Sequence, residues 1–563
     1  MGLQAMLQRS KLRRSELLMP AGSLERLKVA VLYGADAVYM GTPDMSMRTK
    51  SQLSLEDVKE GIEFAHERGV RVYLTLNIFT HNKDIPKLDA YIDTLREVRP
   101  DGVIVSDLGV FHYLQKNAPE FNLHISTQAN VCSWMTVNFW KDLGAELVVL
   151  AREVSFAELT EIREKCPDIR LETFVHGAMC MTYSGRCLLS NFMAERGANQ
   201  GNCANSCRWQ YKVRLKLNDG TTRELELSEE NMKLFEFLLE EGHRPGDLMP
   251  IEEDERGSYI LNSKDLCLMP KLDEYLKLGV DSLKVEGRGK SSYYVATAAR
   301  AYRRAIDDYY DNPEKWDHRP YMRDLEMTGN RGYTLAFHDG RVTNYAHNYE
   351  NTNSVAAWEF GGIVREVRED GFVIDVKNRL QAGDVLEFIP PNSKESPVLL
   401  RLYEFHQADS NEVKLVVHGG PHFKLWVPFE AFDKENVDEI IRKFPELTVI
   451  RKESLLTEEE WERLKLDKLV HKIELGQAPE SIYPDRVKKL QEKISEETFE
   501  KRSKTSGKGL EGCCGRGCNG CLIFWSDPKY AKARELLATK KHGEMLDRNM
   551  RDDLVLIREA INS

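Results

Sequence analysis

Residues 15–41, SELLMPAGSLERLKVAVLYGADAVYMG, contain the pattern that decides the fold. Two short apolar runs, 16–20 and 36–41, flank a stretch whose apolar residues recur at helical spacing and which ends in Gly34. The runs predict buried strands, and the stretch between them predicts an amphipathic helix that stops at the glycine. A strand–helix–strand unit is typical of parallel strands, because parallel neighbours need a crossover connection.

The same alternation continues through the first 340 residues. Amphipathic segments such as 54–69 and 156–166 separate the apolar runs. Further candidate strands lie at 71–77, 102–107, 124–129, 146–151, 171–175 and 282–287. Eight strands alternating with helices predict an α/β fold, a (β/α)8 TIM-like barrel over residues 1–350. An open doubly wound sheet is the alternative, although no GxGxxG motif follows the first strand, as a dinucleotide-binding sheet would require.

The pattern changes in the rest of the chain. Residues 208–262 read as an insertion after the seventh strand, with a β-hairpin followed by a helix at 229–241. From 355 to 435, short alternating runs with glycine turns predict a small all-β barrel. Residues 436–502 are charged and helical in pattern, and residues 510–563 form a helical, cysteine-containing C-terminal tail.

Composition excludes some classes of protein. The chain has 563 residues, which indicates several domains, with 42% apolar and 30% charged residues as in soluble globular proteins. No apolar run approaches the ~20 residues that cross a bilayer, and no signal peptide is recognisable, so we expect a cytoplasmic protein without a membrane partner. A net charge of −11 argues against indiscriminate binding of nucleic acid, but 79 Lys and Arg residues leave room for a local basic groove.

Four cysteines lie within 28 residues: Cys180, Cys187, Cys203 and Cys207, separated by six, fifteen and three residues. Cys180 follows the seventh predicted strand, so the barrel would place this loop on the face formed by the carboxyl ends of its strands, where such barrels carry active sites. Clustered cysteines in a reducing compartment favour metal or cluster ligation over disulfides. Zinc sites more often use two close pairs, and the six-residue gap therefore favours an iron–sulfur cluster over zinc.

A second set of cysteines lies in the tail, in the segment CCGRGCNGC: Cys513, Cys514, Cys518 and Cys521. So short a segment cannot form a core, and a bound metal would supply its folding energy. The segment resembles the small oxidoreductase-like cysteine motif of some redox-linked proteins. We expect a second iron–sulfur cluster or a zinc ion here, with a set of redox-sensing thiols as the alternative.

The residues around the first cysteines resemble a known family. They read Glu172-x-Phe174-x-x-Gly177-Ala178-Met179-Cys180-x4-Gly185-x-Cys187-x-Leu189-Ser190. This is similar to the defining motif of the collagenase-like U-32 peptidase family, and the blocks at 20–41, 126–130 and 263–307 agree with it in order. The resemblance spans residues 15–435.

Despite the family's name, the resemblance implies hydroxylation of RNA or of quinone precursors. It implies a 4Fe–4S cluster held by Cys180, Cys187, Cys203 and Cys207, and a link to prephenate or a metabolite derived from it. The branch with SKDL and KVEGR blocks is similar to tRNA hydroxylation proteins, which make 5-hydroxyuridine at the wobble position, whereas a sister branch hydroxylates a cytidine of ribosomal RNA. Implied partners are tRNA, a small anionic metabolite and the iron–sulfur assembly machinery.

Polar residues at the predicted strand ends are the other candidates for the site. Lys284 and Glu286 alternate onto one face of the last strand, and with His176 they are the candidate catalytic residues. Candidate substrate-binding residues, chosen for strand-end position or for the bidentate fork of arginine, are Arg48, Asn77, Gln128, Arg152 and Arg288. Each could instead cap a helix or form a structural ion pair.

Two other functions stay open. Cys180 and His176 could be drawn as a peptidase nucleophile and base. Four cysteines in one loop fit ligation better, and neither HExxH nor GxSxG occurs in the chain. A scaffold that binds RNA or a protein partner, with purely structural metal sites, is the non-enzymatic alternative.

Overall fold

The computed structural model describes the barrel region and most of the β-rich region that follows it. The described residues are 14–41, 53–180, 182–184, 186–194, 203, 206, 214–216, 222–224, 238–240, 248–250, 252–254, 257–259, 263–340, 358–410, 412–421, 423–432 and 436–453. The cysteine tail, residues 510–563, and most of the predicted helical segment 436–502 lie outside them. The described chain forms two compact units, and residues 379–384 and 401–426 belong to the second.

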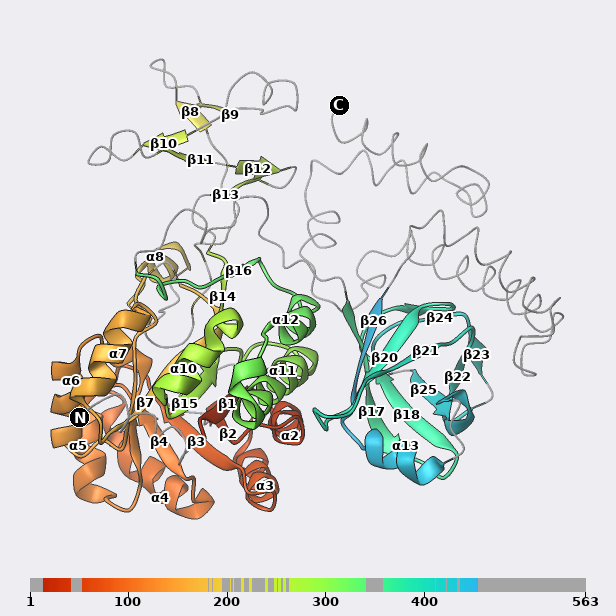
Figure 1. Ribbon diagram of the computed structural model, residues 1–563, viewed down its shortest axis with the longest axis horizontal. Coiled ribbons are helices and arrows are strands. Elements are labelled where there is room, and N and C mark those ends of the chain that lie inside the picture. Colours follow the sequence, from red (N-terminus) through yellow and green to blue (C-terminus); the bar gives the residue numbers. More distant parts are fainter. Residues whose placement is uncertain are drawn as a thin grey trace. The chain divides into compact units, whose positions relative to one another are not determined.

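Eight parallel strands form a closed barrel (Figure 1). They are β1 (Glu16–Ala21), β2 (Ala37–Gly41), β3 (Arg71–Leu76), β4 (Gly102–Val105), β5 (Leu123–Ile125), β6 (Leu147–Val149), β7 (Arg170–Ala178) and β15 (Ser282–Val285). Each strand pairs with the next, and β15 closes the barrel by pairing with both β7 and β1. The predicted (β/α)8 TIM-like barrel is therefore confirmed, and every predicted barrel strand is present.

Helices cover the outside of the barrel. They are α2 (Leu24–Leu32), α3 (Leu55–His66), α4 (Leu88–Val98), α5 (Leu108–Asn117), α6 (Trp134–Asp142), α7 (Phe156–Lys165), α10 (Leu272–Leu278) and α11 (Ser292–Asp311), with α12 (Arg319–Glu326) after them. Several begin at a side-chain cap: Ser54 and Ser155 form capping boxes with Asp57 and Glu158. These caps fix where the helices start, directly after the loops at the carboxyl ends of the strands.

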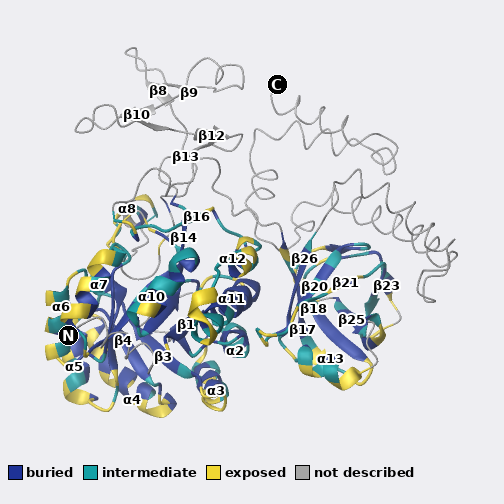
Figure 2. Ribbon diagram, in the orientation of Figure 1, coloured by how far each residue is buried: buried dark blue, intermediate teal, exposed yellow. Residues whose placement is uncertain are grey.

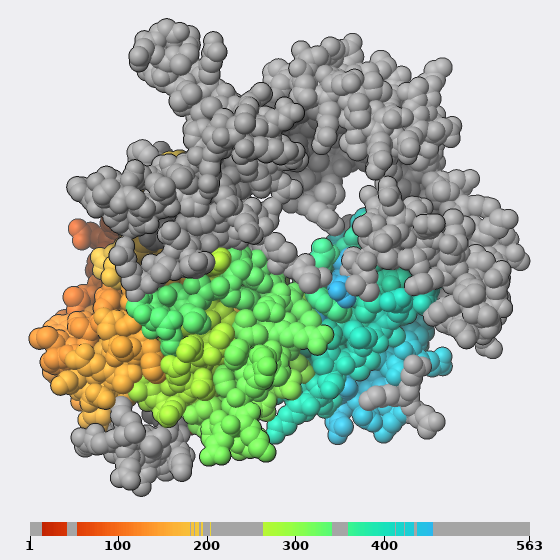
Figure 3. Space-filling model, turned by 45° about the horizontal axis from the view of Figure 1, so that its top comes forward, coloured from red at the N-terminus to blue at the C-terminus, as the bar shows by residue number. Residues whose placement is uncertain are grey.

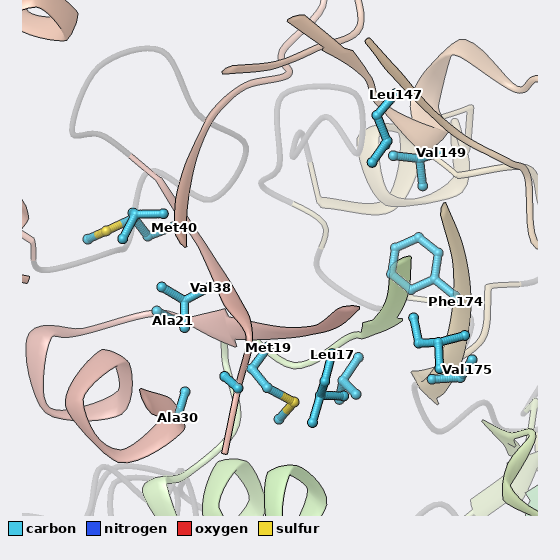
Figure 4. Close-up of a cluster of buried hydrophobic side chains, with 14 of the residues drawn as sticks. Leu17, Met19, Ala21, Ala30, Val38, Met40, Leu147, Val149, Phe174 and Val175 are labelled. Atoms are coloured by element: carbon cyan, nitrogen blue, oxygen red, sulfur yellow. The ribbon is translucent and has the colours of Figure 1, made fainter. Parts of the chain in front are cut away.

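The core lies between the strands and these helices. Figure 2 shows the barrel strands as buried, while the exposed residues lie on the outer sides of the helices. Figure 4 shows Leu17 and Met19 of β1 on one side of that strand and Ala30 of α2 near β1 and β2. Burial of this apolar surface is the main stabilising contribution to the barrel.

An excursion of the chain interrupts the barrel between β7 and β15. It begins after α8 (Leu189–Ala194) and returns through β14 (Asp265–Cys267), which pairs antiparallel with the end of β7, Ala178 opposite Asp265. Short β16 (Tyr333–Thr334) then pairs with β14. In Figure 3 the yellow-green residues that follow β14 lie at the surface between the orange residues before them and the green residues after them.

Within the excursion, the predicted hairpin is confirmed, because β8 (Arg214–Lys216) pairs antiparallel with β9 (Thr222–Glu224). The helix predicted at 229–241 is wrong at its end, where β10 (Leu238–Glu240) pairs with β11 (Leu248–Pro250). A second short hairpin joins β12 (Glu252–Asp254) and β13 (Gly257–Tyr259). Backbone pairing to a neighbouring strand has overridden the local helical pattern.

The β-rich region after residue 358 consists of antiparallel strands, which agrees with the all-β pattern predicted from the sequence. In the first unit, β26 (Val449–Glu453) pairs with β17 (Glu359–Val367) and β20 (Val385–Ile389), and β17 pairs with β18 (Gly371–Val376). In the second unit, β22 (Phe405–Gln407) pairs with β23 (Val413–Lys414) and with the first residues of β25 (Lys424–Pro428). There, β19 (Leu380–Gln381) also pairs with β24 (Val416–Val417). This part of the chain also contains β21 (Val398–Arg401), the short helix η8 (Phe429–Phe432) and α13 (Val437–Lys443).

Strand β26 lies beyond residue 435, where the sequence analysis ended the small β-barrel. The helical pattern predicted from 436 onward is seen in α13, before the chain turns into this strand. None of the helices in the described part of the chain is long and apolar enough to span a bilayer.

Candidate functional site

The carboxyl ends of the barrel strands carry a group of polar side chains, which we call the mouth: Asn77, Gln128, Arg152, Glu286 and Arg288. Gln128 lies in the turn η2 (Thr127–Ala129) after β5, and its side-chain oxygen accepts hydrogen bonds from Asn77 Nδ2 at 3.4 Å and Ser106 Oγ at 3.3 Å. Ser126 donates to the same oxygen. One amide thus connects the loops after β3, β4 and β5.

On the other side of the mouth, Arg152 and Glu286 form an ion pair. Arg152 Nη2 donates to Glu286 Oε2 at 3.1 Å, and the guanidinium lies 4.0 Å from the centre of the Phe174 ring. The arginine side chain is nearly buried, whereas the glutamate is about one-fifth exposed. An arginine held over an aromatic ring and by a carboxylate has fewer orientations open to its remaining N–H groups, which suits recognition of a planar anion.

Arg288 reaches across the mouth from the loop after β15. Its Nη1 donates to Thr75 Oγ1 of β3 at 2.9 Å, and its backbone carbonyl accepts from Arg26 Nη1 at 3.1 Å. Gly22 packs against this backbone, and a Cβ atom there would collide with the Arg288 carbonyl. The loop after β1 therefore holds the arginine only while position 22 has no side chain.

Gly177, in the motif around Cys180, is also a position that only glycine can occupy without strain. Its φ of +118° is unfavourable for other residues, and a Cβ atom would lie 2.7 Å from both Cβ and the carbonyl oxygen of Glu286. The Glu286 amide donates to the carbonyl of His176 at 2.8 Å. The segment 286–288 thus lies between two glycines, one after β1 and one at the end of β7.

Lys284 lies opposite Phe174 of β7, and its Nζ is 5.5 Å from the centre of that ring. Its Nζ is 2.7 Å from Glu172 Oε1 and 4.5 Å from the centre of the Tyr39 ring. Only 6% of the lysine side chain and 1% of the glutamate side chain are exposed. Lys284 therefore pairs with Glu172 of β7, whereas Glu286 pairs with Arg152. Between Lys284 and Val285, the register of β15 against β7 shifts.

A hydrogen-bonded group of polar and charged residues, which we call the interior network, lies on the barrel strands β1, β3, β7 and β15. Ser282 Oγ lies 2.9 Å from Glu172 Oε2 and 3.1 Å from Glu16 Oε1. Tyr73 and Arg170 donate to Glu16 Oε2 at 3.0 and 3.3 Å, and Arg71 also pairs with it. Burial raises the pKa of Glu16, and the neighbouring arginines oppose that shift. The members are Glu16, Arg71, Tyr73, Arg170, Glu172, Ser282 and Lys284.

His176 lies among aromatic rings next to α11 and β16. It is 1% exposed, its Nδ1 is 3.4 Å from the Tyr302 hydroxyl, and the rings of Tyr294, Tyr302 and Tyr333 are centred 5.4 to 5.8 Å away. Burial lowers its pKa to about 4, so the imidazole is neutral at physiological pH. The structure therefore places His176 in a packed layer, and its catalytic role stays a prediction.

The cysteine loop, residues 180–207, starts at the end of β7. Cys180 and Cys203 are exposed and Cys187 is half-buried, while Cys207 lies outside the described residues. Next to Cys187, Arg186 Nε donates to Asn130 Oδ1 at 2.8 Å, and its guanidinium is 4.9 Å from the Phe79 ring centre. This part of the loop therefore lies over the loops after β3 and β5.

The structure thus brings together five predicted residues, Asn77, Gln128, Arg152, Glu286 and Arg288. It places Lys284 and His176 apart from the mouth. Arg48, Cys207, Cys513, Cys514, Cys518 and Cys521 lie outside the described residues, and no metal-ligand group of three His, Cys, Asp or Glu occurs within the described part. Ligation by the cysteines therefore stays a prediction.

Several residues that contact the predicted site residues or one another were not predicted from the sequence. Glu16, Arg170 and Glu172 carry charges inside apolar runs, which could have marked them as members of a buried network. Arg186 and Asn130 gave no such signal, because their contact joins loops that are far apart in the chain.

Comparison with known proteins decides the family. The model of Peptidase family U32 matches residues 22–348, more than half of the chain. The chain belongs to peptidase family U32. The model of the Peptidase family U32 C-terminal domain matches residues 356–441, so the β-rich region also belongs to the family. Both matches end well before the tail cysteines.

Relatives of this U32 chain have names that state different functions. The tRNA hydroxylation protein P of Escherichia coli (strain K12) is 37% identical over 454 residues, covering 77% of this chain and 97% of the relative. A 23S rRNA 5-hydroxycytidine synthase of the same organism is 32% identical over 294 residues, covering 52% and 39%. The collagenase of Porphyromonas gingivalis is 31% identical over 353 residues, covering 59% and 76%.

Proposed function

We propose that this U32 protein is an RNA hydroxylase that converts the wobble uridine of tRNA to 5-hydroxyuridine. One observation carries the proposal: the chain matches a tRNA hydroxylation protein at 37% identity over 97% of that protein's length. The ribosomal RNA relative covers a smaller share of both chains, which favours tRNA over ribosomal RNA as the substrate.

Cys180, Cys187, Cys203 and Cys207 are the proposed ligands of a 4Fe–4S cluster. The donor set supports this, since thiolates are the ligands that iron–sulfur clusters use, and Cys180 directly follows the strand that borders Glu286. The cluster, when bound, would supply one-electron redox chemistry beside the mouth. The tail cysteines, Cys513, Cys514, Cys518 and Cys521, are proposed to hold a second cluster or a zinc ion.

The mouth would bind the reactants. Arg152 and Arg288 have guanidinium groups at the rim of the barrel, which suit a carboxylate or a phosphate, including a small acid such as a prephenate-derived metabolite. Asn77 and Gln128 offer amide groups of the kind that read the edge of an unstacked base. Glu286 holds Arg152 in position, and the buried Lys284 stabilises the strand that carries both Glu286 and the loop of Arg288.

Nucleoside mass spectrometry tests the reaction. A strain without this gene should lack 5-hydroxyuridine in tRNA, and the wild-type gene should restore it, whereas Cys180→Ser should not. Unchanged 5-hydroxyuridine in a deletion strain without a redundant homologue would overturn the assignment. If the deletion strain keeps 5-hydroxyuridine in tRNA but loses a hydroxylated cytidine from ribosomal RNA, the substrate is ribosomal RNA.

Anaerobic purification tests the cofactor. We expect about four iron and four sulfide ions per site of four thiolates, with a brown chromophore. Cys187→Ser should remove the iron and the absorbance that belong to the first site. Stoichiometric zinc without the chromophore would contradict the cluster.

Peptidase activity is the second candidate, and the collagenase relative is the observation that favours it. A Cys180–His176 pair would be the machinery, but His176 is buried and its Nδ1 faces Tyr302. Cleavage of a gelatin substrate by the purified protein, abolished by Cys180→Ser but not by removal of iron, would support the peptidase.

A further inference from the structure

One side chain of the cysteine loop connects it to two other loops of the barrel. Arg186 lies between Gly185 and Cys187, at a position for which the motif specifies no residue type. Its Nε donates to Asn130 Oδ1 at 2.8 Å, and its guanidinium is 4.9 Å from the ring centre of Phe79. Phe79 follows β3 and Asn130 follows η2, so the arginine joins the loops after β3, β5 and β7.

Asn130 presents a fixed acceptor to this arginine. Its backbone adopts the left-handed conformation, with φ 53° and ψ 49°, which asparagine tolerates better than most residues. Its amide donates to the Thr127 carbonyl at 2.9 Å, and its own carbonyl is 3.5 Å from the Cys132 thiol, which donates to it. These bonds fix the backbone that carries the Oδ1 acceptor.

The same turn contains Gln128, whose side-chain oxygen accepts from Asn77 and Ser106. A displacement of Asn130 by the loop would therefore be transmitted to an amide of the mouth two residues away. The contact between a cationic donor and an amide oxygen, combined with an aromatic ring, is stronger than a neutral hydrogen bond at the same exposure.

We propose that Arg186 is a positioning residue that docks the cysteine loop onto the Thr127–Asn130 turn, and so sets where Cys187 lies relative to the mouth. The docking itself follows from the contacts above. Its effect on turnover rests on the proposed function.

Amide hydrogen exchange in the full-length protein, purified anaerobically, tests the docking. Arg186→Gln and Asn130→Gly should each raise exchange of the peptide that covers residues 182–190 about fivefold, because each removes one side of the contact. Glycine keeps the left-handed backbone at position 130 without strain. The double variant should exchange no faster than either single variant.

Arg186→Lys should restore part of the protection, since it keeps the charge above Phe79 and one donor for Asn130. Arg68→Gln is the matched control: Arg68 also lies over a phenylalanine, 3.7 Å from the centre of the Phe64 ring, but in the turn that follows helix α3. It should leave exchange of residues 182–190 unchanged.

Turnover and chelation distinguish positioning from a merely structural role. Arg186→Gln should lose iron to a chelator about fivefold faster, and kcat for nucleoside hydroxylation should fall about tenfold with KM for tRNA unchanged. Arg186→Lys should recover most of both. A change in KM alone would mean that Arg186 contacts RNA, which overturns the proposal.

Unchanged exchange in Arg186→Gln, or additive effects in the double variant, would also overturn it. If the exchange results hold but the protein binds no iron and makes no hydroxylated nucleoside, the docking role stands and the proposed function falls.

Discussion

The interior network and the mouth are both polar, but they differ in how far their carboxylates are buried. In the interior, Lys284 and Glu172 are almost fully buried and each has a partner of opposite charge within the barrel. At the mouth, Glu286 is partly exposed, and Arg288 donates to a neutral hydroxyl. Charges that are paired and buried inside a fold serve its integrity, whereas a guanidinium at the rim of a barrel lies where an added anion can reach it. The two regions should therefore respond differently to substitution.

Lys284→Met should give the largest loss of stability. It leaves the buried Glu172 carboxylate without its ammonium partner, which costs about 3–5 kcal/mol when a buried pair is broken. The denaturant midpoint, followed by circular dichroism, measures it. Lys59→Met is the control, since the Lys59–Glu97 pair is exposed, and its midpoint should match that of the parent. The double variant Lys284→Met/Glu172→Leu should recover most of the loss; a double variant as unstable as Lys284→Met would show that the pair is not the cause.

Gly22→Ala tests the close approach of the loop after β1 to the backbone of Arg288 at the mouth. The added methyl group meets the rigid backbone of Arg288, and overpacking against backbone costs about 3 kcal/mol. Both the unfolding midpoint and the yield of hydroxylated nucleoside should fall. Gly361→Ala is the matched substitution, because a Cβ atom there has only ordinary contacts of 3.4 Å and longer. Equal midpoints for the two variants would contradict the close approach.

Acidification should destabilise the protein through protonation of the buried His176 on β7. The pKa of His176 is about 4 in the folded protein and 6.5 in the unfolded chain, so the unfolded chain binds more protons between these values. The stability that the neutral imidazole contributes is present above pH 6.5 and is lost as pH falls towards 4, by about 2 kcal/mol at pH 5. Unfolding midpoints at pH 7 and pH 5 should therefore diverge more in the parent than in His176→Phe. Parallel shifts in both proteins would rule out this histidine as the source.

Glu286→Gln should have the smallest effect on stability and a large effect on function. The amide can still accept from Arg152, so the midpoint should change by only about 1 kcal/mol. Product formation should fall about tenfold, because Arg152 is no longer neutralised and oriented by a carboxylate. Glu97→Gln, at an exposed pair, should change neither quantity. A midpoint shift as large as that of Lys284→Met would remove the distinction between the regions.

The barrel was predictable because its strands are nearly continuous apolar runs, as parallel strands buried on both faces require. Strand β14 was missed because it has three residues and pairs antiparallel with the end of β7. Strand β10 was mistaken for helix because isolated hairpins leave a weak pattern in sequence. Strand β26 escaped notice because it follows α13, after the alternating pattern has ended.

The members of the mouth were predictable from strand ends alone, but their partners were not. Alternation placed Lys284 and Glu286 on one face, and the register shift after Lys284 gives them different surroundings. His176 was chosen for its residue type and its position at a strand end, and neither property reveals that its ring packs against Tyr294, Tyr302 and Tyr333. Burial by distant segments is a tertiary property that a single sequence does not display.

The pairing of Ala178 with Asp265 has a consequence for engineering. It brings together the two ends of the 86-residue segment 179–264, on neighbouring strands within about 5 Å of each other. A segment that leaves and re-enters a scaffold at one point can change length at small entropic cost, since closure depends only weakly on loop length. The seam between β7 and β14 is therefore a natural graft point, where a foreign module could be exchanged while the closed barrel keeps its register.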